Sequence, residues 1–239
     1  MAMLFGFPGA GAGVHFFEIW KERLKDEMEF REILHNRRLG RQYCDNMAEA
    51  AGICAGEVLS LSEGEKELYF FGFSMGAAIA YETAKLLAKE HGIFIRGLFV
   101  AAASSPEVPI EDGIAQLDDS AFAGKIRSHG IYPEEFFVNP ALLKLILPKI
   151  RADYRLIEGY CDRERFVLPC PIAGFFGKDD VSVTEEGIAG WAAYTDCDFR
   201  KFYFPGTHYF YYDHQEEIIA KIRELIGGYR TETPAERRS

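Results

Sequence analysis

The pentapeptide Gly72-Phe73-Ser74-Met75-Gly76 constrains this chain more than any other feature of its sequence. It follows an apolar run at 68–71 and leads into a helical pattern that we expect over about 76–91. A strand, a G-x-S-x-G turn and a helix form a nucleophile elbow, which lifts the serine hydroxyl out of the sheet, where the helix dipole favours negative charge. Because the motif is short, an ordinary structural turn is the alternative, and the choice depends on the rest of the chain.

A serine nucleophile needs a base and an orienting carboxylate, and in this type of fold the acid precedes the histidine in the sequence. Buried-strand patterns at 171–176 and 199–204 lead into loops that carry an acidic pair and His208, respectively. Loops in this position lie at the carboxyl edge of an open α/β sheet, where ligands bind. His214 lies in a polar helix start, which indicates a solvated surface residue. Four histidines precede the acidic pair and therefore break the expected order: His15, His35, His91 and His129.

Two neighbouring carboxylates compete for the role of the orienting acid. Asp180 lies three residues after Gly177, which is the spacing usual for acid loops in this fold. Asp179 is the alternative, because it could be the carboxylate that faces the histidine. We favour Asp180 and keep Asp179 open.

An oxyanion hole needs two backbone N–H groups near the serine. Met75, directly after the serine, is expected to supply one of them. The other is expected from the glycine-rich loop at 8–13, through Gly9 or Ala10, because glycine lets the backbone approach a bound group closely. The alternative for this loop is a dinucleotide-phosphate site, but the spacing is not G-x-G-x-x-G and no P-loop Lys-Ser/Thr follows.

Over nearly its whole length the chain resembles the type II thioesterases, stand-alone α/β-hydrolases of polyketide and nonribosomal peptide assembly lines. The most specific likeness is the run at 147–154, Leu-Pro-Lys-Ile-Arg-Ala-Asp-Tyr, which is similar to the family's Leu-Pro-x-x-Arg-Ala-Asp-Phe. Further segments are similar to the family's opening, elbow, lid and closing motifs, and they lie at 7–11, 72–77, 132–135, 139–143 and 205–210.

The chain departs from the family pattern at positions that we expect to line the substrate pocket. Gly9 and Phe73 each stand where the family has histidine, Thr207 stands where it has glycine, and Val181 replaces the proline that commonly follows the acid. None of these changes removes Ser74, an acid or His208. They leave the acyl preference open.

The sequence pattern and the resemblance together indicate the α/β class: an α/β-hydrolase fold with a mostly parallel central sheet flanked by helices. Strand–helix alternation is interrupted at about 110–162, which we interpret as an inserted helical lid within one domain over 1–239. Pro133, Asn139-Pro140 and Pro148 are expected breaks between its helices. The polar tail at about 231–239 is expected to be mobile.

The lid also supplies candidates for substrate binding. Its apolar residues recur at helical spacing, and we expect most of them to pack on the core. Phe137 and Leu143, together with Phe73, are the residues that we assign to substrate binding.

Five further elements are expected from the sequence. The first four are a helix at about 15–26, a strand at 29–34, a helix capped by Asp45 and running to about 60, and a strand at 95–101. A fifth element, a helix at 215–229, is expected to close the fold.

The resemblance implies a serine hydrolase that acts on thioesters and needs neither a metal nor a redox cofactor. Ser74 would attack an acyl group on the phosphopantetheine arm of an acyl or peptidyl carrier protein, His208 would take its proton, and Asp180 would orient the imidazole. The implied role is the removal of aberrant acyl groups in antibiotic or other secondary metabolism. An acyl-CoA thioesterase or a carboxylesterase with the same triad is the alternative enzyme. A catalytically silent hydrolase-fold binding protein is the alternative of another class.

The composition sets limits on partners and location. The net charge of −10 argues against nucleic acid, and no apolar run reaches membrane length. The chain begins almost directly with a strand pattern and its five cysteines lack metal-ligand spacing, so we expect a cytoplasmic monomer with reduced thiols and no signal peptide. Carrier proteins are usually acidic, so docking one would need an apolar or a basic patch on this chain. The candidates for a basic patch are Arg37, Arg38, Arg41, Lys149 and Arg151. The alternative is that these residues are ordinary solvated surface charges.

Overall fold

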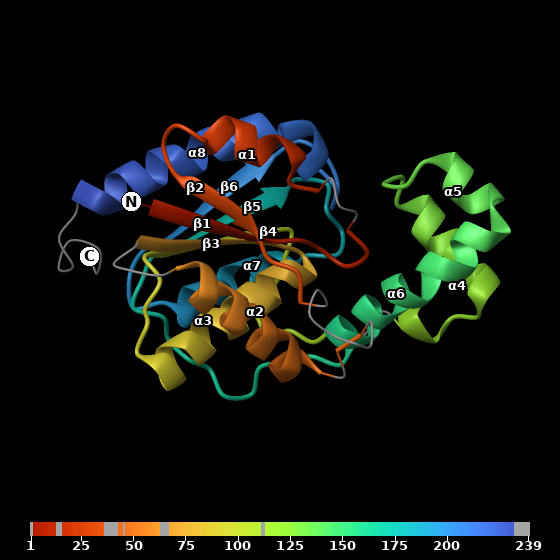
Figure 1. Cartoon of the computed structure of the whole chain (residues 1–239), viewed down its shortest axis with the longest axis horizontal. Helices are drawn as coiled ribbons and strands as arrows, with labels where there is room; N and C mark the ends of the chain where they lie inside the picture. The colour runs from red at the N-terminus through yellow and green to blue at the C-terminus, as the bar shows by residue number, and fades with distance from the viewer. Residues whose placement is uncertain are drawn as a thin grey trace.

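The computed structural model describes residues 2–12, 16–35, 43–44, 46–62, 67–110 and 113–231. In this part of the chain, six parallel strands form one sheet in the order β2-β1-β3-β4-β5-β6 (Figure 1). This arrangement confirms the predicted α/β class with a parallel central sheet. The strands are β1 (Ala2–Phe7), β2 (Glu29–Glu32), β3 (Glu67–Phe73), β4 (Gly97–Ala101), β5 (Ile172–Gly177) and β6 (Phe199–Phe204).

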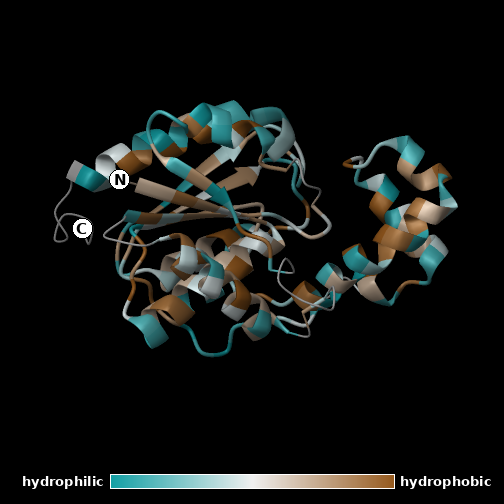
Figure 2. Cartoon of the chain, in the orientation of Figure 1, coloured by the Kyte–Doolittle hydropathy of each residue, from teal (hydrophilic) through white to brown (hydrophobic). Residues whose placement is uncertain are grey.

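Helices cover both faces of the sheet, and side chains alternate between the two faces along each strand. Met3 and Phe5 of β1 pack against α2 (Met47–Leu61) and α3 (Met75–His91). Leu4 packs on the opposite side, under α1 (Glu18–Leu24) and α8 (Tyr211–Thr231) (Figure 1). The inner strands β1, β3, β4 and β5 therefore read as nearly continuous apolar runs, which Figure 2 shows as brown ribbon at the centre of the fold, whereas the edge strands β2 and β6 carry charged residues.

The start of α2 corrects one predicted helix cap. Asn46, rather than Asp45, caps this helix, because its Oδ1 accepts a hydrogen bond of 3.0 Å from the N–H of Glu49. The two residues are adjacent and have nearly equal cap preference, so the sequence pattern does not separate them. Asp45 and the tail beyond Thr231 lie outside the described residues.

Residues 113–158, in the connection between β4 and β5, form the lid, a helical unit beyond the carboxyl ends of the strands (Figure 1). An apolar cluster of its own holds the lid helices together, and Phe122, Phe136, Leu147 and Ile150 are buried in it. The lid comprises the short 3₁₀ turn η1 (Ile114–Gln116) and the helices α4 (Asp119–Ser128), α5 (Glu134–Val138) and α6 (Pro140–Glu158). After β5 the chain adds α7 (Glu185–Gly190) and the 3₁₀ turn η2 (Trp191–Tyr194).

Prolines mark two of the three expected lid breaks, and the third expectation was wrong. Pro133 precedes α5, and Asn139 caps α6 by accepting the N–H groups of Ala141 and Leu142. Pro148 lies inside α6, which continues through it. A proline removes one helical hydrogen bond, but the neighbouring Leu147 and Ile150 are buried in the lid cluster, and this packing holds the helix together.

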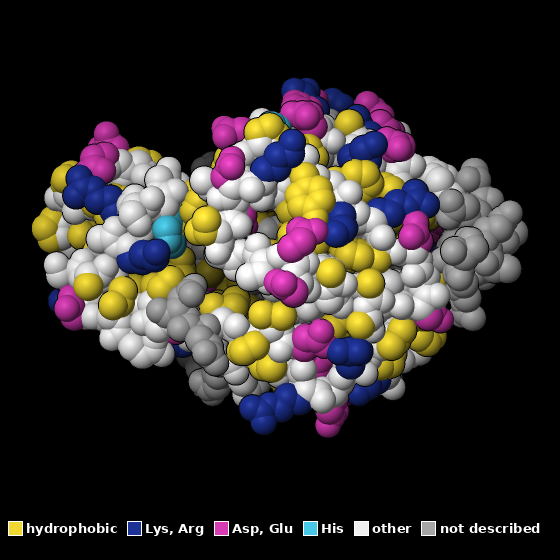
Figure 3. Space-filling model, turned by 180° about the vertical axis from the view of Figure 1, so that it is seen from behind, with side chains coloured by type: hydrophobic (Ala, Val, Ile, Leu, Met, Phe, Trp, Pro, Cys, Tyr) yellow, Lys and Arg dark blue, Asp and Glu magenta, His cyan; other side chains and the backbone are white. Residues whose placement is uncertain are grey.

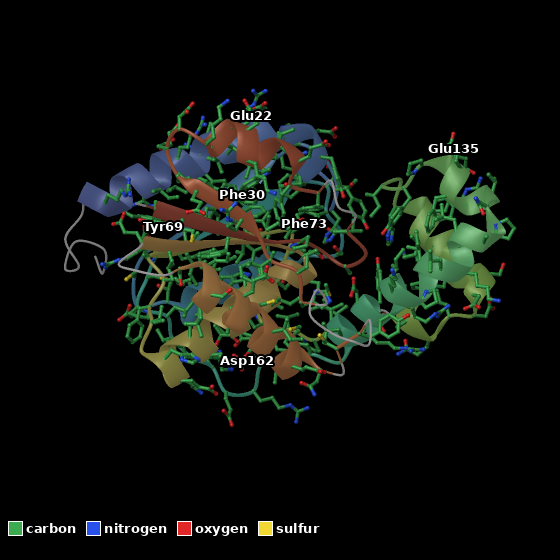
Figure 4. The ribbon with its side chains drawn as sticks, viewed as in Figure 1. Glu22, Phe30, Tyr69, Phe73, Glu135 and Asp162 are labelled. Atoms are coloured by element: carbon green, nitrogen blue, oxygen red, sulfur yellow. The ribbon has the colours of Figure 1, made fainter. Side chains whose placement is uncertain are left out.

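A polar network fastens the chain after α6 to helix α3. Lys85 Nζ donates to Asp162 Oδ1 and the Tyr81 hydroxyl donates to Asp162 Oδ2, and both donor–acceptor distances are 2.9 Å. Burial disfavours the charged form of Asp162, but the hydrogen bonds from Lys85 and Tyr81 outweigh this cost and hold the pKa of the carboxyl below its ordinary value. Tyr160 adds a 2.8 Å hydrogen bond to Glu82. One end of the lid is thus fixed to the sheet body, while Glu135 lies at the far tip (Figure 4).

None of the helices in the described part of the chain combines the length and the apolar character that crossing a membrane requires.

We predict that the lid opens independently of the sheet body. Backbone amides of α4, α5 and the first half of α6 should exchange with deuterated solvent faster than those of β3, because the lid packs mainly on its own small cluster. Helix α3 is the matched control, since it is helical but belongs to the body. Lid amides as protected as those of α3 would contradict the prediction.

Candidate active site

The backbone at Ser74 adopts the strained conformation of a nucleophile elbow. Ser74 has φ 52° and ψ −121°, in the left-handed half of the map that residues with a Cβ rarely adopt. A Cβ at Gly72 would overlap the carbonyl of Gly76, and one at Gly76 would overlap the carbonyl of Phe7. Both flanking glycines are therefore required for the sharp turn from β3 into α3.

Three loops at the carboxyl edge of the sheet bring Ser74, His208 and Asp180 together. Ser74 Oγ lies 3.0 Å from His208 Nε2, and His208 Nδ1 lies 2.8 Å from Asp180 Oδ2. The Asp180 side chain is only 3% exposed, whereas that of His208 is 23% exposed and can meet a substrate. The serine follows β3, the aspartate follows β5 and the histidine follows β6.

The two neighbouring aspartates, Asp179 and Asp180, make different contacts. Asp180 is the carboxylate at His208, as favoured from the spacing. Asp179 points elsewhere, because its Oδ2 accepts a 3.3 Å hydrogen bond from the N–H of Gly206 and so braces the loop that carries the histidine.

Ser182 is a site residue that the sequence analysis did not find. Its hydroxyl donates to Asp180 Oδ1 over 2.6 Å and its N–H donates to the same oxygen over 2.9 Å. Burial disfavours the charged Asp180, but the hydrogen bonds with His208 and Ser182 prevail and keep the pKa of this carboxyl below its ordinary value. The signal in the sequence was the Asp-x-Ser spacing, which is typical of an aspartate that turns back on its own backbone.

The expected oxyanion donors lie around Ser74. Met75 is the first residue of α3, where an α-helix leaves its N–H groups without partners inside the helix. Gly9 and Ala10 line the same cavity as Ser74, and a 3.1 Å hydrogen bond from the N–H of Ala12 to the carbonyl of Gly9 closes their turn. The glycine-rich loop and the serine therefore border the same cavity, and the assignment of the second donor to this loop stays a prediction.

Two of the departures from the family pattern touch each other. The ring of Phe73 packs edge-on against His208, with 5.5 Å between ring centroids, and it lines the cavity. A Cβ at Gly9 would lie only 2.9 Å from Phe73 Cδ1. Phe73 therefore fills the space that a side chain at position 9 would need. Figure 4 shows Phe73 at the end of β3 that faces the lid.

A cavity of about 480 Å³ lies over Ser74 and His208, between the lid and the sheet body. Figure 3 shows hydrophobic side chains in the hollow between these two parts. Its apolar wall includes Ile114, Ile131 and Ile157 of the lid. The size is within the usual range for small-molecule sites.

The structure does not bring Phe137 or Leu143 into this cavity. Both pack on the apolar cluster inside the lid. They belong to α5 and the first turn of α6, which lie at the end of the lid remote from the sheet (Figure 1). Helical spacing identified them as buried, but it does not say which buried surface they join.

His129 lines the cavity. The order of residues along the chain excluded it as the base but did not predict this position. Its Nδ1 lies 3.2 Å from the Tyr154 hydroxyl, and its ring packs on Tyr209 with 5.4 Å between centroids. Burial, with smaller contributions from Lys125 and His208, lowers the pKa of His129 to about 4. At neutral pH this imidazole is uncharged, so it is a polar but neutral part of the cavity wall.

Several surface assignments change in the structure. His214 is only partly exposed, because it hydrogen-bonds Glu217 and packs on Phe204. Arg151 is not a docking residue: its side chain is 11% exposed, bonds Asp119 and the carbonyl of Ala115, and lies over a lid ring. Lys149 is half-buried. The basic residues at 37, 38 and 41 lie outside the described residues.

Comparison with known proteins agrees with this geometry. The model of the thioesterase domain family matches residues 2–226. Thioesterase PikA5 of Streptomyces venezuelae is 31% identical over 92% of this chain and 79% of its own. ClbQ from the colibactin NRPS/PKS pathway superposes with a TM-score of 0.86 at 26% identity, over 96% of this chain and 98% of its own. The type II thioesterase BorB from the borrelidin biosynthetic cluster gives 0.82 at 27% identity, over 93% and 91%.

The family model covers almost the whole chain, and the matched region contains the elbow, both loops beside it and the lid. The chain belongs to the thioesterase family.

Proposed function

We propose that this protein is a type II thioesterase that hydrolyses acyl thioesters from the phosphopantetheine arm of a carrier protein. The observation that carries the proposal is the chain of hydrogen bonds from Ser74 through His208 to Asp180, at the floor of a cavity covered by the lid. The names of the similar proteins, which place them in polyketide and nonribosomal peptide pathways, support the substrate class.

The geometry supports the following catalytic roles. Ser74 Oγ attacks the thioester carbonyl while His208 Nε2, 3.0 Å away, takes its proton. Asp180 holds the imidazole in the tautomer that exposes Nε2 as an acceptor and stabilises the imidazolium that forms. The N–H groups of Met75 and of the Gly9–Ala10 turn stabilise the oxyanion.

The second half of the reaction reuses the same groups. When the carbonyl re-forms, the C–S bond breaks, and the pantetheine sulfur leaves with the proton from His208. A water molecule then gives a proton to His208 and attacks the acyl-serine. The second tetrahedral intermediate collapses, the proton returns to Ser74 Oγ, and the free acid leaves.

The same proposal includes a cytoplasmic, monomeric enzyme that edits carrier-bound acyl groups. The five cysteines are thiols, as suits a reducing compartment. The mostly apolar cavity suits the carbon chain of an acyl group.

A comparison of three substrates with one acyl group tests the proposal. We expect kcat/KM to be highest for the acyl group on a carrier protein, lower for the acyl-CoA and lowest for a simple ester, because only the first offers both the arm and a docking surface. A preference for the CoA or the simple ester would instead identify an acyl-CoA thioesterase or a carboxylesterase. No turnover, with no labelling of Ser74 by a serine-directed phosphonate, would identify a binding protein.

We predict that Ser74→Ala abolishes hydrolysis and leaves the fold intact. Losing the nucleophile of a triad can cost on the order of a million-fold in kcat. The far-ultraviolet circular dichroism and the melting temperature should stay close to those of the unmodified protein. Near-normal turnover would overturn the assignment of the nucleophile.

We also predict that Asp180→Asn is far more damaging than Asp179→Asn. Without the carboxylate, His208 adopts the wrong tautomer, and such a change can cost about ten-thousand-fold in kcat. Asparagine at 179 can still accept the N–H of Gly206 through its amide oxygen, so we expect a small loss there. Steady-state kinetics of both variants decide the point. If Asp179→Asn lowers kcat more than Asp180→Asn does, Asp179 is the orienting acid.

A further inference from the structure

The lid forms hydrogen bonds with both the N–H and the carbonyl of Gly11, a residue of the glycine-rich loop. The N–H of Gly11 donates to Asp153 Oδ2 of helix α6 over 2.9 Å. The carbonyl of the same residue accepts a hydrogen bond from the hydroxyl of Tyr132, which lies between α4 and α5. Two separate parts of the lid therefore grip the backbone one residue beyond the Gly9–Ala10 turn.

Asp153 is itself fixed from the sheet body. Its second oxygen, Oδ1, lies 3.0 Å from Nε2 of His35, which follows β2. The side chains of Asp153 and His35 are only 13% and 8% exposed. Because both carboxylate oxygens have a partner on the body, the direction in which the carboxylate meets Gly11 is set when the lid lies against the sheet.

The contact with the lid leaves no room for a different loop residue. Gly11 has φ +68°, a conformation that favours glycine, and a Cβ there would lie 2.7 Å from the Tyr132 hydroxyl and 3.0 Å from Cγ2 of Ile150. The loop and the lid are thus in direct van der Waals contact at this point. A displacement of the lid would release both hydrogen bonds of Gly11 together.

We propose that Asp153 is a positioning residue through which the closed lid sets the oxyanion hole. With Tyr132, it holds Gly11 and thereby fixes the turn whose N–H groups face the reacting carbonyl. This inference rests on the proposed function, since it assigns an oxyanion donor to the Gly9–Ala10 turn. Lid closure then completes the catalytic site as well as covering the acyl group.

The expected size of the effect follows from what an oxyanion donor supplies. Removing one donor outright costs about a hundred- to a thousand-fold in kcat. Asp153→Ala leaves the donor in place but lets its turn drift, and misplacement by about 1 Å can cost a hundred-fold. We therefore expect a loss of about ten- to a hundred-fold in kcat, with a smaller change in KM.

A pair of ketone inhibitors separates positioning of the oxyanion hole from general support of the fold. A trifluoromethyl ketone that matches the acyl chain of the substrate adds to the serine and forms an oxyanion, whereas the matched methyl ketone binds without a stable adduct. We expect Asp153→Ala to weaken the trifluoromethyl ketone about as much as it lowers kcat and to leave the affinity for the methyl ketone nearly unchanged. Equal weakening of both ketones, or of neither, would overturn the inference.

Glu158→Ala is the matched control on the same helix. Glu158 is also a carboxylate of α6 that accepts a backbone N–H, but its partner is Ala115 inside the lid, at 3.0 Å. This variant perturbs the lid without touching Gly11, so it should retain the preference for the trifluoromethyl ketone. A loss equal to that of Asp153→Ala would show that any disturbance of α6 has the same effect, and would also overturn the inference.

Two conservative variants keep the test decisive if Asp153→Ala fails to fold. Asp153→Asn can still accept from Gly11 and can donate to His35, so it should lie within about threefold of the unmodified enzyme, as expected if geometry rather than charge matters. Tyr132→Phe removes the other hydrogen bond and should selectively weaken the trifluoromethyl ketone. The inference would be contradicted if Asp153→Asn lowered kcat as much as Asp153→Ala, or if Tyr132→Phe left the affinity for the trifluoromethyl ketone unchanged.

The outcomes also separate this inference from the proposed function. If the unmodified protein binds the two ketones equally, or if Ser74→Ala binds the trifluoromethyl ketone as well as the unmodified protein does, the serine mechanism itself fails and the inference falls with it. If the unmodified protein strongly prefers the trifluoromethyl ketone and Asp153→Ala keeps that preference, only the inference fails.

Discussion

The conformation of Ser74 is the constraint on which the rest of the site depends. A residue with a Cβ is held at positive φ because β3 must turn into α3 within one residue, and only glycine fits two residues before it and two residues after it. The strained turn costs free energy locally. The burial of β3 and α3 in the core stabilises the fold and so holds the turn in this conformation. Its result is a hydroxyl that stands above the carboxyl edge of the sheet, at the height of the loops after β5 and β6. Asp180 and His208 can then reach it from neighbouring strands without any distortion of the sheet.

The groups around the triad hold it in place at two distances. Near the site, Ser182 braces the acid within its own loop, and Asp179 joins this loop to the loop that carries the histidine. Farther away, the network of Lys85 and Asp162 fixes the chain as it leaves the lid. The lid is thus attached at its return to the body, while its helices pack on one another in a cluster of their own. This distribution suits a cover that must admit an acyl group on a long arm and then exclude water.

The sequence predicted what depends on local pattern and on order along the chain. Strand and helix periodicity, with the order serine, acid and histidine, identified the sheet and the three residues that the structure brings together. Predictions that depended on which surface a side chain meets were less successful. Phe137 and Leu143 have the right spacing for burial but join the lid cluster instead of the cavity. Pro148 breaks no helix because packing on both sides outweighs the lost hydrogen bond. His129 enters the cavity from 79 residues before His208, and nothing in its local sequence indicates that contact.

The run at 147–154 shows why a short motif can be specific without carrying any reacting atom. Asp153 points away from Arg151 on α6, because two residues are rotated by about 200°, whereas Arg151 and Tyr154, three residues apart, share a face and both pack on Phe122. Arg151 ties α6 to the start of α4 and to η1, Asp153 reaches the loop after β1, and Tyr154 meets His129 in the cavity wall. A single turn of helix therefore connects the interior of the lid, the glycine-rich loop and the wall of the acyl cavity. Asp153 meets the loop after β1, whereas Arg151 and Tyr154 bond residues of the lid itself, so the three side chains serve the packing of the lid and its contact with the loop rather than the chemistry of the acyl transfer.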